Sequence, residues 1–414
     1  MIKNICVSCG SPLSKDIVYI GDQYPSAIFV EEGDPIVDEL EPKSLNVSRC
    51  TNEKCNLVQL TNVCDLQYVF DHYPYESNST ASMKSILQDV VDGAKRFVDL
   101  TEEDVVLDIG GNDGTLLNLI QEPVQAKVNI DAAAGVEQIF SADNYTHVHA
   151  KFSSEEYRAL DLPNPRLIFS TAMFYHLSNP VDFCKEVYDI MSEDSVWVLQ
   201  LTYLGTMLEN NIFDNIVHEH VAYYSLASLE FLLSQVGLHI SEAQLVESYG
   251  GSLRVFITKP LMNWRKEYHK IHRYEKDHGT NTYEALYAFN SRTQLLHDSI
   301  KSTIDHLVDL MGPLWGFGAS TKGNMILQFL GVDTNHISCI LDNGTKKIGK
   351  RTLGTNIPIV AEADYLDRLP KYVLVLPYYY TNVFKRIIQG QLSPGQTVYL
   401  LIPLPYPYFI KVSK

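Results

Sequence analysis

Short apolar runs alternate with helically spaced apolar residues through the middle of the chain. The run Val105–Ile109 is almost continuously apolar, as expected of a strand buried on both faces. Further strands are predicted at 127–130, 166–170, 195–203 and 253–258, and helices at 83–98, 180–191 and 226–236. Strands that alternate with helices predict an α/β domain with a doubly wound, mainly parallel sheet.

A second α/β pattern follows a long helical segment. Residues 263–311 carry charged and aromatic residues at helical spacing with no strand signal. Strands are then predicted at 314–317, 337–341, 372–376 and 397–402, which repeats the β–α plan of the middle of the chain. We therefore predict three domains: a small N-terminal domain (1–66), a central Rossmann-like domain (67–261) and a second Rossmann-like α/β domain (262–414).

The first central strand ends in a glycine-rich turn. Gly110, Gly111 and Gly114 allow the backbone to bend sharply and to approach a ligand, and Asp131 ends the next strand where an acidic residue can accept ribose hydroxyls. The spacing is not that of the dinucleotide fingerprint; with Asp108 before the glycines, it resembles the first motif of class I S-adenosylmethionine methyltransferases. An ordinary β–α turn without a cofactor is the alternative. The predicted cofactor residues are Asp108, Gly110, Gly111, Asn112, Asp113, Gly114, Asp131 and Ser170.

Four of the seven cysteines form two short knuckles. Cys6 and Cys9 make the first, and Cys50 and Cys55 make the second. Two such pairs are typical of a structural zinc site with four thiolate ligands. A segment of about 60 residues has little core of its own, and a metal would supply part of its stability.

Composition narrows the possible partners. The net charge is −17 and no long basic run occurs, which disfavours binding to a nucleic acid polymer. No run approaches the roughly 20 apolar residues of a membrane span. We expect a cytoplasmic protein with reduced cysteines, no membrane partner and a monomeric state.

Ionisable and aromatic side chains cluster at two further places. His218, Glu219 and His220 stand in a row, and in an extended segment both histidines would share one face. They do not match the helical zinc motif, so a catalytic metal is not indicated. The loop at 71–79, with Tyr73 and Tyr75, is either a substrate lid or an ordinary surface loop. His176, after the strand at 166–170, is a candidate site residue or a structural histidine.

The second α/β unit opens with a possible phosphate site. Gly316 and Gly318 precede a helix start that carries hydroxyls and one lysine, a composition suited to a phosphate cradle. The third glycine of a dinucleotide fingerprint is missing, so these glycines are weak evidence for NAD.

With these pieces in order, the chain resembles sugar C-methyltransferases of deoxysugar biosynthesis, which methylate C3 of a nucleotide-linked 4-keto-6-deoxyhexose. The resemblance covers the cysteine pairs, the LDIGGNDGTLL motif, the His-Glu-His cluster, Gly250–Leu253 and the GASTKGN segment. It implies S-adenosylmethionine and structural zinc as cofactors, with His220 as the base that removes the C3 proton. The remaining implied site residues are Glu219, His176 and Tyr75 at the reaction centre, and Tyr73, His218, Ser320, Thr321, Lys322 and Asn324 around the TDP- or GDP-linked sugar.

The chain departs from that family at three positions. Val217 stands where the family usually has a tyrosine, and Asp108 and Asp131 stand where glutamate is common. Val217 therefore removes any hydroxyl-mediated role at that position.

The implied chemistry is methylation of an enolate. A proton beside a ketone becomes removable by histidine when donors such as Tyr75 or His176 stabilise the oxyanion. The alternatives are a sugar O-methyltransferase, an NAD(P)-dependent nucleotide-sugar reductase, or a zinc-knuckle binding protein with an inactive core.

Overall fold

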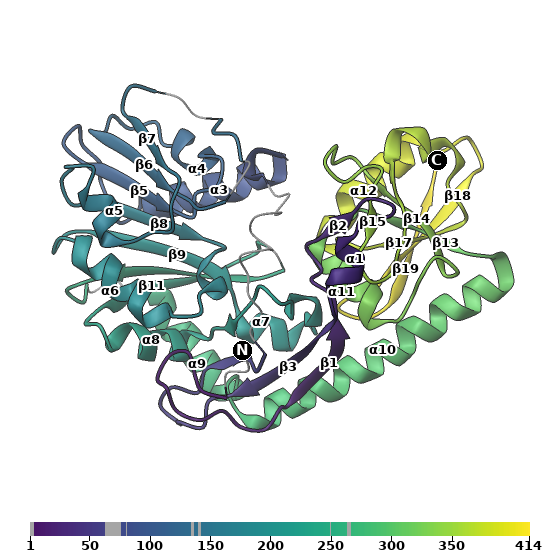
Figure 1. The fold of residues 1–414 in the computed structure, drawn as a ribbon, viewed down its shortest axis with the longest axis horizontal. Coiled ribbons are helices and arrows are strands. Elements are labelled where there is room, and N and C mark those ends of the chain that lie inside the picture. Colours follow the sequence, from purple (N-terminus) through teal and green to yellow (C-terminus); the bar gives the residue numbers. More distant parts are fainter. Residues whose placement is uncertain are drawn as a thin grey trace.

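The computed structural model describes residues 4–62, 76–79, 81–133, 136–139, 142–248, 250–262 and 266–414. Two large sheets lie at opposite ends of the molecule, and the N-terminal strands β1 and β3 run between them (Figure 1). The predicted α/β class with Rossmann-like sheets is confirmed. Among the described residues, no helix combines the length and apolar character needed to cross a bilayer.

The central sheet has seven strands. Their order is β11 (His239–Val246), β12 (Ser252–Thr258), β9 (Val196–Thr202), β8 (Leu167–Thr171), β5 (Val105–Ile109), β6 (Ala126–Ile130) and β7 (Tyr145–Val148). β9, β8, β5, β6 and β7 are parallel, whereas β12 and β11 are antiparallel additions. β5, β6 and β9 are buried along their whole length, as strands covered on both faces must be.

Three predicted helices of the central unit are confirmed as α3 (Ala81–Ala94), α6 (Pro180–Ile190) and α8 (Leu226–Ser234), and α9 (Lys266–His278) lies in the predicted helical segment 263–311. Periodicity did not predict the short helices α4 (Thr115–Asn118), α5 (Ser154–Arg158) and α7 (Leu204–Glu209). α9 is fixed to the sheet because Glu242 of β11 accepts the backbone N–H of Tyr268 at 2.9 Å. α6 begins with Pro180 in its first turn, where a missing N–H costs nothing.

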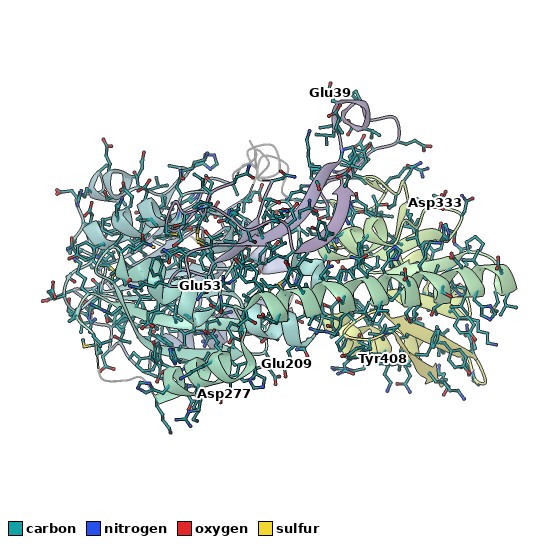
Figure 2. All side chains as sticks on the ribbon, turned by 90° about the horizontal axis from the view of Figure 1, so that it is seen from below. Glu39, Glu53, Glu209, Asp277, Asp333 and Tyr408 are labelled. Carbon is teal, nitrogen blue, oxygen red and sulfur yellow. The ribbon has the colours of Figure 1, made fainter. Side chains whose placement is uncertain are left out.

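The C-terminal sheet has six strands. Their order is β16 (Ile359–Ala361), β14 (Ile337–Asp342), β13 (Leu314–Phe317), β17 (Tyr372–Val375), β18 (Thr397–Ile402) and β19 (Tyr408–Ser413). All pairs are parallel except β18 with β19. α11 (Thr321–Phe329) follows β13, α12 (Thr381–Gln391) follows β17, and α10 (Tyr283–Met311) runs lengthwise along the molecule to this sheet (Figure 2).

The N-terminal segment pairs with both large units. β1 (Val18–Gln23), β3 (Lys43–Arg49) and β4 (Val58–Leu60) form a sheet whose fourth strand, β10 (Ala222–Tyr223), comes from the central unit. β2 (Phe29–Val30), which precedes the short helix α1 (Ile36–Glu39), pairs instead with β15 (Arg351–Thr352) of the C-terminal unit.

One hydrophobic cluster joins the three segments of the chain. It contains Ile20 and Leu45 from the N-terminal strands, Phe213 from the central unit, and Ile326 and Leu374 from the C-terminal unit. Because apolar burial of this kind contributes about 1.5–3 kcal/mol per large side chain, the cluster holds the two large sheets together. The predicted boundary at residue 66 lies outside the described residues.

Candidate active site

The glycine turn after β5 has the backbone conformation that its sequence predicts. Gly110, Asn112 and Gly114 have φ values of 73°, 53° and 80°, all in the left-handed region. Gly111 is required for space, since a Cβ there would lie 2.5 Å from Asn129 Oδ1 and 2.6 Å from Asp108 Oδ2. The turn is therefore shaped by close approach to buried polar groups.

Three carboxylates surround this turn. Asp131 accepts the N–H of Asn112 at 2.8 Å, and Asp113 accepts the N–H of Asn78 at 2.7 Å. Asp108 is buried within β5. Burial raises the pKa of Asp108 to about 8, and the charges of Asp131 and Asp113 add to the rise. A cationic ligand is the partner that such a group of acids favours.

The end of β8 forms the neighbouring wall. Ser170 is fully buried and accepts a hydrogen bond from the Trp197 indole at 3.1 Å, so its side chain lies outside the cavity. Thr171 lines the cavity, and its buried hydroxyl has no partner among the described residues. Ala172 has φ 57°, which is rare without glycine and often marks a functional site.

A cavity of about 1700 Å³ joins the glycine turn to the other predicted site residues. It is lined by Gly110, Asn112 and Asp131 on the cofactor side, His176, Val217, Glu219 and His220 in the middle, and Ser320, Thr321 and Lys322 from α11. Residues from both large sheets thus face one space. Tyr73 and Tyr75 lie outside the described residues.

The His-Glu-His cluster forms a turn instead of an extended strand. The N–H of His220 bonds to the carbonyl of Val217 at 3.0 Å, and this separates the two histidines. His220 and Glu219 line the cavity, whereas His218 does not; its Nε2 lies 3.3 Å from the Lys43 carbonyl oxygen.

His220 is held in one tautomer. Its Nδ1 lies 2.8 Å from the carbonyl oxygen of Asn215, which can only accept, so Nδ1 carries the proton and Nε2 keeps its lone pair. Burial holds the pKa of His220 well below its usual range, with smaller contributions from His176 and Lys322. The neutral imidazole is therefore available as a base.

Glu219 and His176 are also shifted by their surroundings. Burial raises the pKa of Glu219 to about 7, and its Oε2 has no partner among the described residues. Burial lowers the pKa of His176 to about 3, and its ring stacks on that of His220 with centroids 5.5 Å apart. Burial thus favours the neutral forms of both side chains in the middle of the cavity.

The start of α11 faces the cavity from the C-terminal sheet. Ser320 is the N-cap, and its hydroxyl accepts the N–H of Gly323. Asn324 lies outside the cavity lining and donates to the Ser26 carbonyl at 3.1 Å. Gly318 has φ 83°, and a Cβ there would lie 2.4 Å from Pro377. Packing against Pro377 therefore explains why Gly318, the second glycine of the predicted phosphate cradle, is a glycine.

Sequence reasoning missed several residues of the cavity wall. They are Phe29 from β2, Lys346 and Lys347 after β14, and Pro377, Tyr379 and Tyr380 after β17. The last group could have been found, because it directly follows a predicted parallel strand, and ligands gather at the carboxyl ends of such strands.

The four predicted zinc ligands converge. The sulfur atoms of Cys6, Cys9, Cys50 and Cys55 all lie within 4.8 Å of one another. Cys6 and Cys55 are 3.6 Å apart and Cys9 and Cys50 are 3.5 Å apart, close to the roughly 3.8 Å between sulfurs on a tetrahedral zinc with Zn–S bonds of about 2.3 Å. The donor set fits structural zinc.

Comparison with known proteins agrees with this architecture. Residues 83–243 match the family model of a methyltransferase domain, so the central sheet with its glycine turn defines an S-adenosylmethionine-dependent methyltransferase. Residues 247–405 match the C-methyltransferase C-terminal domain. The chain is 27% identical over 417 residues to C-methyltransferase NovU of Streptomyces niveus, covering 99% of this chain and 97% of that protein. The two family models and the full-length relative together support an S-adenosylmethionine-dependent C-methyltransferase.

Solved structures match a smaller part of the chain. A chain from the complex of the Haloferax volcanii Trm112 activator with a methyltransferase is 14% identical, with 46% of this chain and 97% of that chain covered and a TM-score of 0.36. An Aquifex aeolicus methyltransferase is 18% identical, with 45% and 100% covered and a TM-score of 0.32.

Replacing Gly111 tests the glycine turn. We expect Gly111→Ala to lower S-adenosylmethionine affinity at least about tenfold, because the added methyl must displace Asn129 or Asp108. Gly390→Ala in α12 is the control, since nothing lies within 4 Å of its Cβ position. Isothermal titration calorimetry measures both, and wild-type affinity in Gly111→Ala would contradict the assignment.

The raised pKa of Asp108 predicts a pH-dependent preference for the sulfonium. A cationic ligand favours the carboxylate, so binding releases a proton below pH 8 and the affinity for S-adenosylmethionine rises with pH, by up to about tenfold per unit. S-adenosylhomocysteine lacks the positive sulfur and serves as the reference ligand. We expect the ratio of the two dissociation constants to change between pH 6 and 8 in the wild type and to be flat in Asp108→Asn. A flat wild-type ratio would show that Asp108 does not ionise on binding.

The cysteine cluster predicts bound zinc that supports the neighbouring strands. We expect Cys50→Ser to lose the metal, measured by mass spectrometry of the elements, and to exchange amide hydrogens faster in β4 and β10, which pair directly. Cys339→Ser, at a buried cysteine outside the cluster, should keep zinc and wild-type exchange. Retention of zinc by Cys50→Ser would exclude the four-thiolate site.

Proposed function

We propose that this C-methyltransferase methylates C3 of a TDP- or GDP-linked 4-keto-6-deoxy sugar through an enolate, with His220 as the base. The observation that supports this most is the single cavity of about 1700 Å³, which exposes the glycine turn, His220 and the start of α11 together. A nucleotide-linked sugar has an anionic tail and a reactive ring, and the cavity offers different chemistry at its two ends.

The cofactor would occupy the glycine-turn side. Gly110 and Asn112 would face it, Asp131 would accept the ribose hydroxyls, and Asp108 would balance its charge. When bound, S-adenosylmethionine supplies an electrophilic methyl group. The four thiolates would hold zinc in a purely structural role, since the cysteine cluster lies outside the cavity lining.

The sugar would lie between His220 and α11. His220 Nε2 would take the C3 proton while the N–H on Nδ1 stays bonded to Asn215. Glu219, with one carboxyl oxygen unpaired among the described residues, would contact a sugar hydroxyl, and neutral His176 would help to fix the ring. Ser320 and Thr321 at the N-terminus of α11 would bind phosphate oxygens.

Because burial lowers the pKa of His220 and weakens it as a base, geometry would supply much of the rate enhancement. Fixing the ring carbon next to both the base and the methyl donor can supply about 7–11 kcal/mol in favourable cases. A general base typically contributes about 10²–10⁴-fold on top of this.

The two histidines of the cluster give a matched pair of variants. We expect His220→Asn to bind S-adenosylmethionine normally and to lose about 10²–10⁴-fold in turnover, whereas His218→Asn, outside the cavity lining, keeps most turnover. Product mass and NMR would be followed with a panel of TDP- and GDP-4-keto-6-deoxy sugars. The expected product carries a C–CH₃ singlet.

Solvent deuterium locates the carbon. C3 and C5 both adjoin the C4 ketone, and only the deprotonated carbon exchanges its hydrogen in D₂O. Exchange at C3 that persists at the wild-type rate in His220→Asn would exclude His220 as the base. Exchange and methylation at C5 would reassign the position, and an OCH₃ product would exclude the enolate.

A further inference from the structure

A lysine with unused hydrogen-bonding capacity faces the middle of the cavity. Lys322 lies in the first turn of α11, and its Nζ lies 3.3 Å from the hydroxyl of Tyr379 and 4.7 Å from the centre of that ring. An ammonium has three N–H donors. Within the described part of the chain, Lys322 forms no ion pair at 4.0 Å or less and bonds only to Tyr379.

Three other lysines line the cavity, and two of them differ in this respect. Lys346 bonds to Glu76 at 2.5 Å, and Lys347 bonds to Asp342 at 2.8 Å and to the Ala319 carbonyl. Both belong to the loop after β14 and carry a carboxylate partner. The third, Lys151, is exposed and follows β7 of the central unit. Among the described cavity lysines of the C-terminal unit, Lys322 is therefore the one whose donors remain available for a ligand.

The buried carboxylate of Asp214 holds the tyrosine that Lys322 contacts. Asp214 is fully buried and lies 3.0 Å from the hydroxyl of Tyr378 and 3.3 Å from that of Tyr379. Asp214 belongs to the central unit, whereas Tyr378, Tyr379 and Lys322 belong to the C-terminal unit, so the network crosses between the two sheets. Burial lowers the pKa of Lys322, and the nearby charge of Asp214 opposes this and favours the ammonium.

Three glycines make room for the tyrosine segment. A Cβ at Gly250 would lie 2.3 Å from the Tyr379 ring, one at Gly318 would lie 2.4 Å from Pro377, and one at Gly323 would lie 2.7 Å from Leu376. These glycines come from two motifs, GGSL and GASTKGN, that are far apart in sequence. Their common effect is to set the position of residues 376–380.

The same short turn orients the base. Asp214 and Asn215 are neighbours in the turn Phe213–Asn215, and Asn215 is the residue whose carbonyl holds Nδ1 of His220. Asn215 therefore orients the imidazole of His220, and Asp214, the residue before it, anchors Tyr379, which contacts the ammonium of Lys322. Lys322 and His220 line the same cavity, next to Val217, which has no hydroxyl to offer an oxyanion.

We propose that Lys322 is a catalytic residue whose ammonium donates a hydrogen bond to the C4 oxygen of the keto sugar, with Asp214 and Tyr379 as positioning residues. This inference rests on the proposed function. When the C–H bond beside the ketone breaks, its proton moves to Nε2 of His220, and its electron pair becomes the new C–C double bond. The carbonyl π pair moves onto the C4 oxygen, where the ammonium stabilises it without giving up its proton.

Solvent exchange at saturating sugar tests this role. The wild type and Lys322→Met would be incubated in D₂O with S-adenosylhomocysteine and the TDP- or GDP-4-keto-6-deoxy sugar that the wild type methylates. We expect the exchange rate beside the ketone to fall about 10²–10³-fold in Lys322→Met, the usual effect of losing one oxyanion donor. Affinity for TDP or GDP alone should stay within about twofold. Lys385→Met, at an exposed position of α12 outside the cavity lining, is the control and should keep the wild-type exchange rate at saturation.

The positioning residues need a separate readout. We expect Tyr379→Phe to slow exchange by less than Lys322→Met and to increase the kinetic isotope effect for sugar deuterated beside the ketone, because proton removal becomes slower than later steps. Ethylammonium should restore part of the exchange in Lys322→Ala and none in Tyr379→Phe, which keeps its lysine.

Other outcomes would overturn the inference in distinguishable ways. Wild-type exchange at saturation in Lys322→Met, together with weakened TDP or GDP binding, would make Lys322 a diphosphate ligand. If no keto sugar of the panel is methylated by the wild type, the proposed function fails first, and the role of Lys322 falls with it. Thermal melting of each variant separates loss of the donor from loss of the fold.

Discussion

The spacing between two sheets is the constraint on which this enzyme depends, and the N-terminal segment sets it. β4 pairs with β10, directly after His220, while β2 of the same segment pairs with β15 beyond α11. Methyl transfer to carbon requires the donor, the carbanion and the base to be aligned within a fraction of an ångström. An N-terminal segment that pairs with one strand of the central unit and one of the C-terminal unit holds the two units more rigidly than a flexible linker would.

The cysteine knuckles belong to this N-terminal segment. The N–H of Cys50 bonds to the Leu57 carbonyl, and the N–H of Leu60 bonds to the carbonyl of Val221, one residue after His220. Backbone hydrogen bonds thus lead in two steps from the cysteine cluster to the loop that carries His220. A metal at this site would therefore order more than the small domain that contains it.

Burial makes the charges of the cavity effective. Asp108, Glu219 and His220 are all buried. Burial raises the pKa of the two acids and lowers that of the histidine, so the neutral form of each is favoured. In a low-dielectric site a remaining ammonium interacts strongly with any new negative charge. The site keeps its own ionisable groups close to neutrality, so charge that develops on a substrate meets few competing charges.

The sequence by itself determined the fold class, the parallel strands, the glycine turn and the cluster of four cysteines. Each depends on local signals: continuous apolar runs, glycines before a helix, and cysteine pairs at ligand spacing. It also indicated His220 and Glu219 as site residues, because adjacent ionisable side chains are costly to bury without partners. What it could not indicate was how distant segments meet. The packing of Tyr379 on Gly250 and the hydrogen bond between Asp214 and Tyr379 that supports Lys322 both join residues of different units. Such contacts have no periodicity along the chain, so only the tertiary structure decided them.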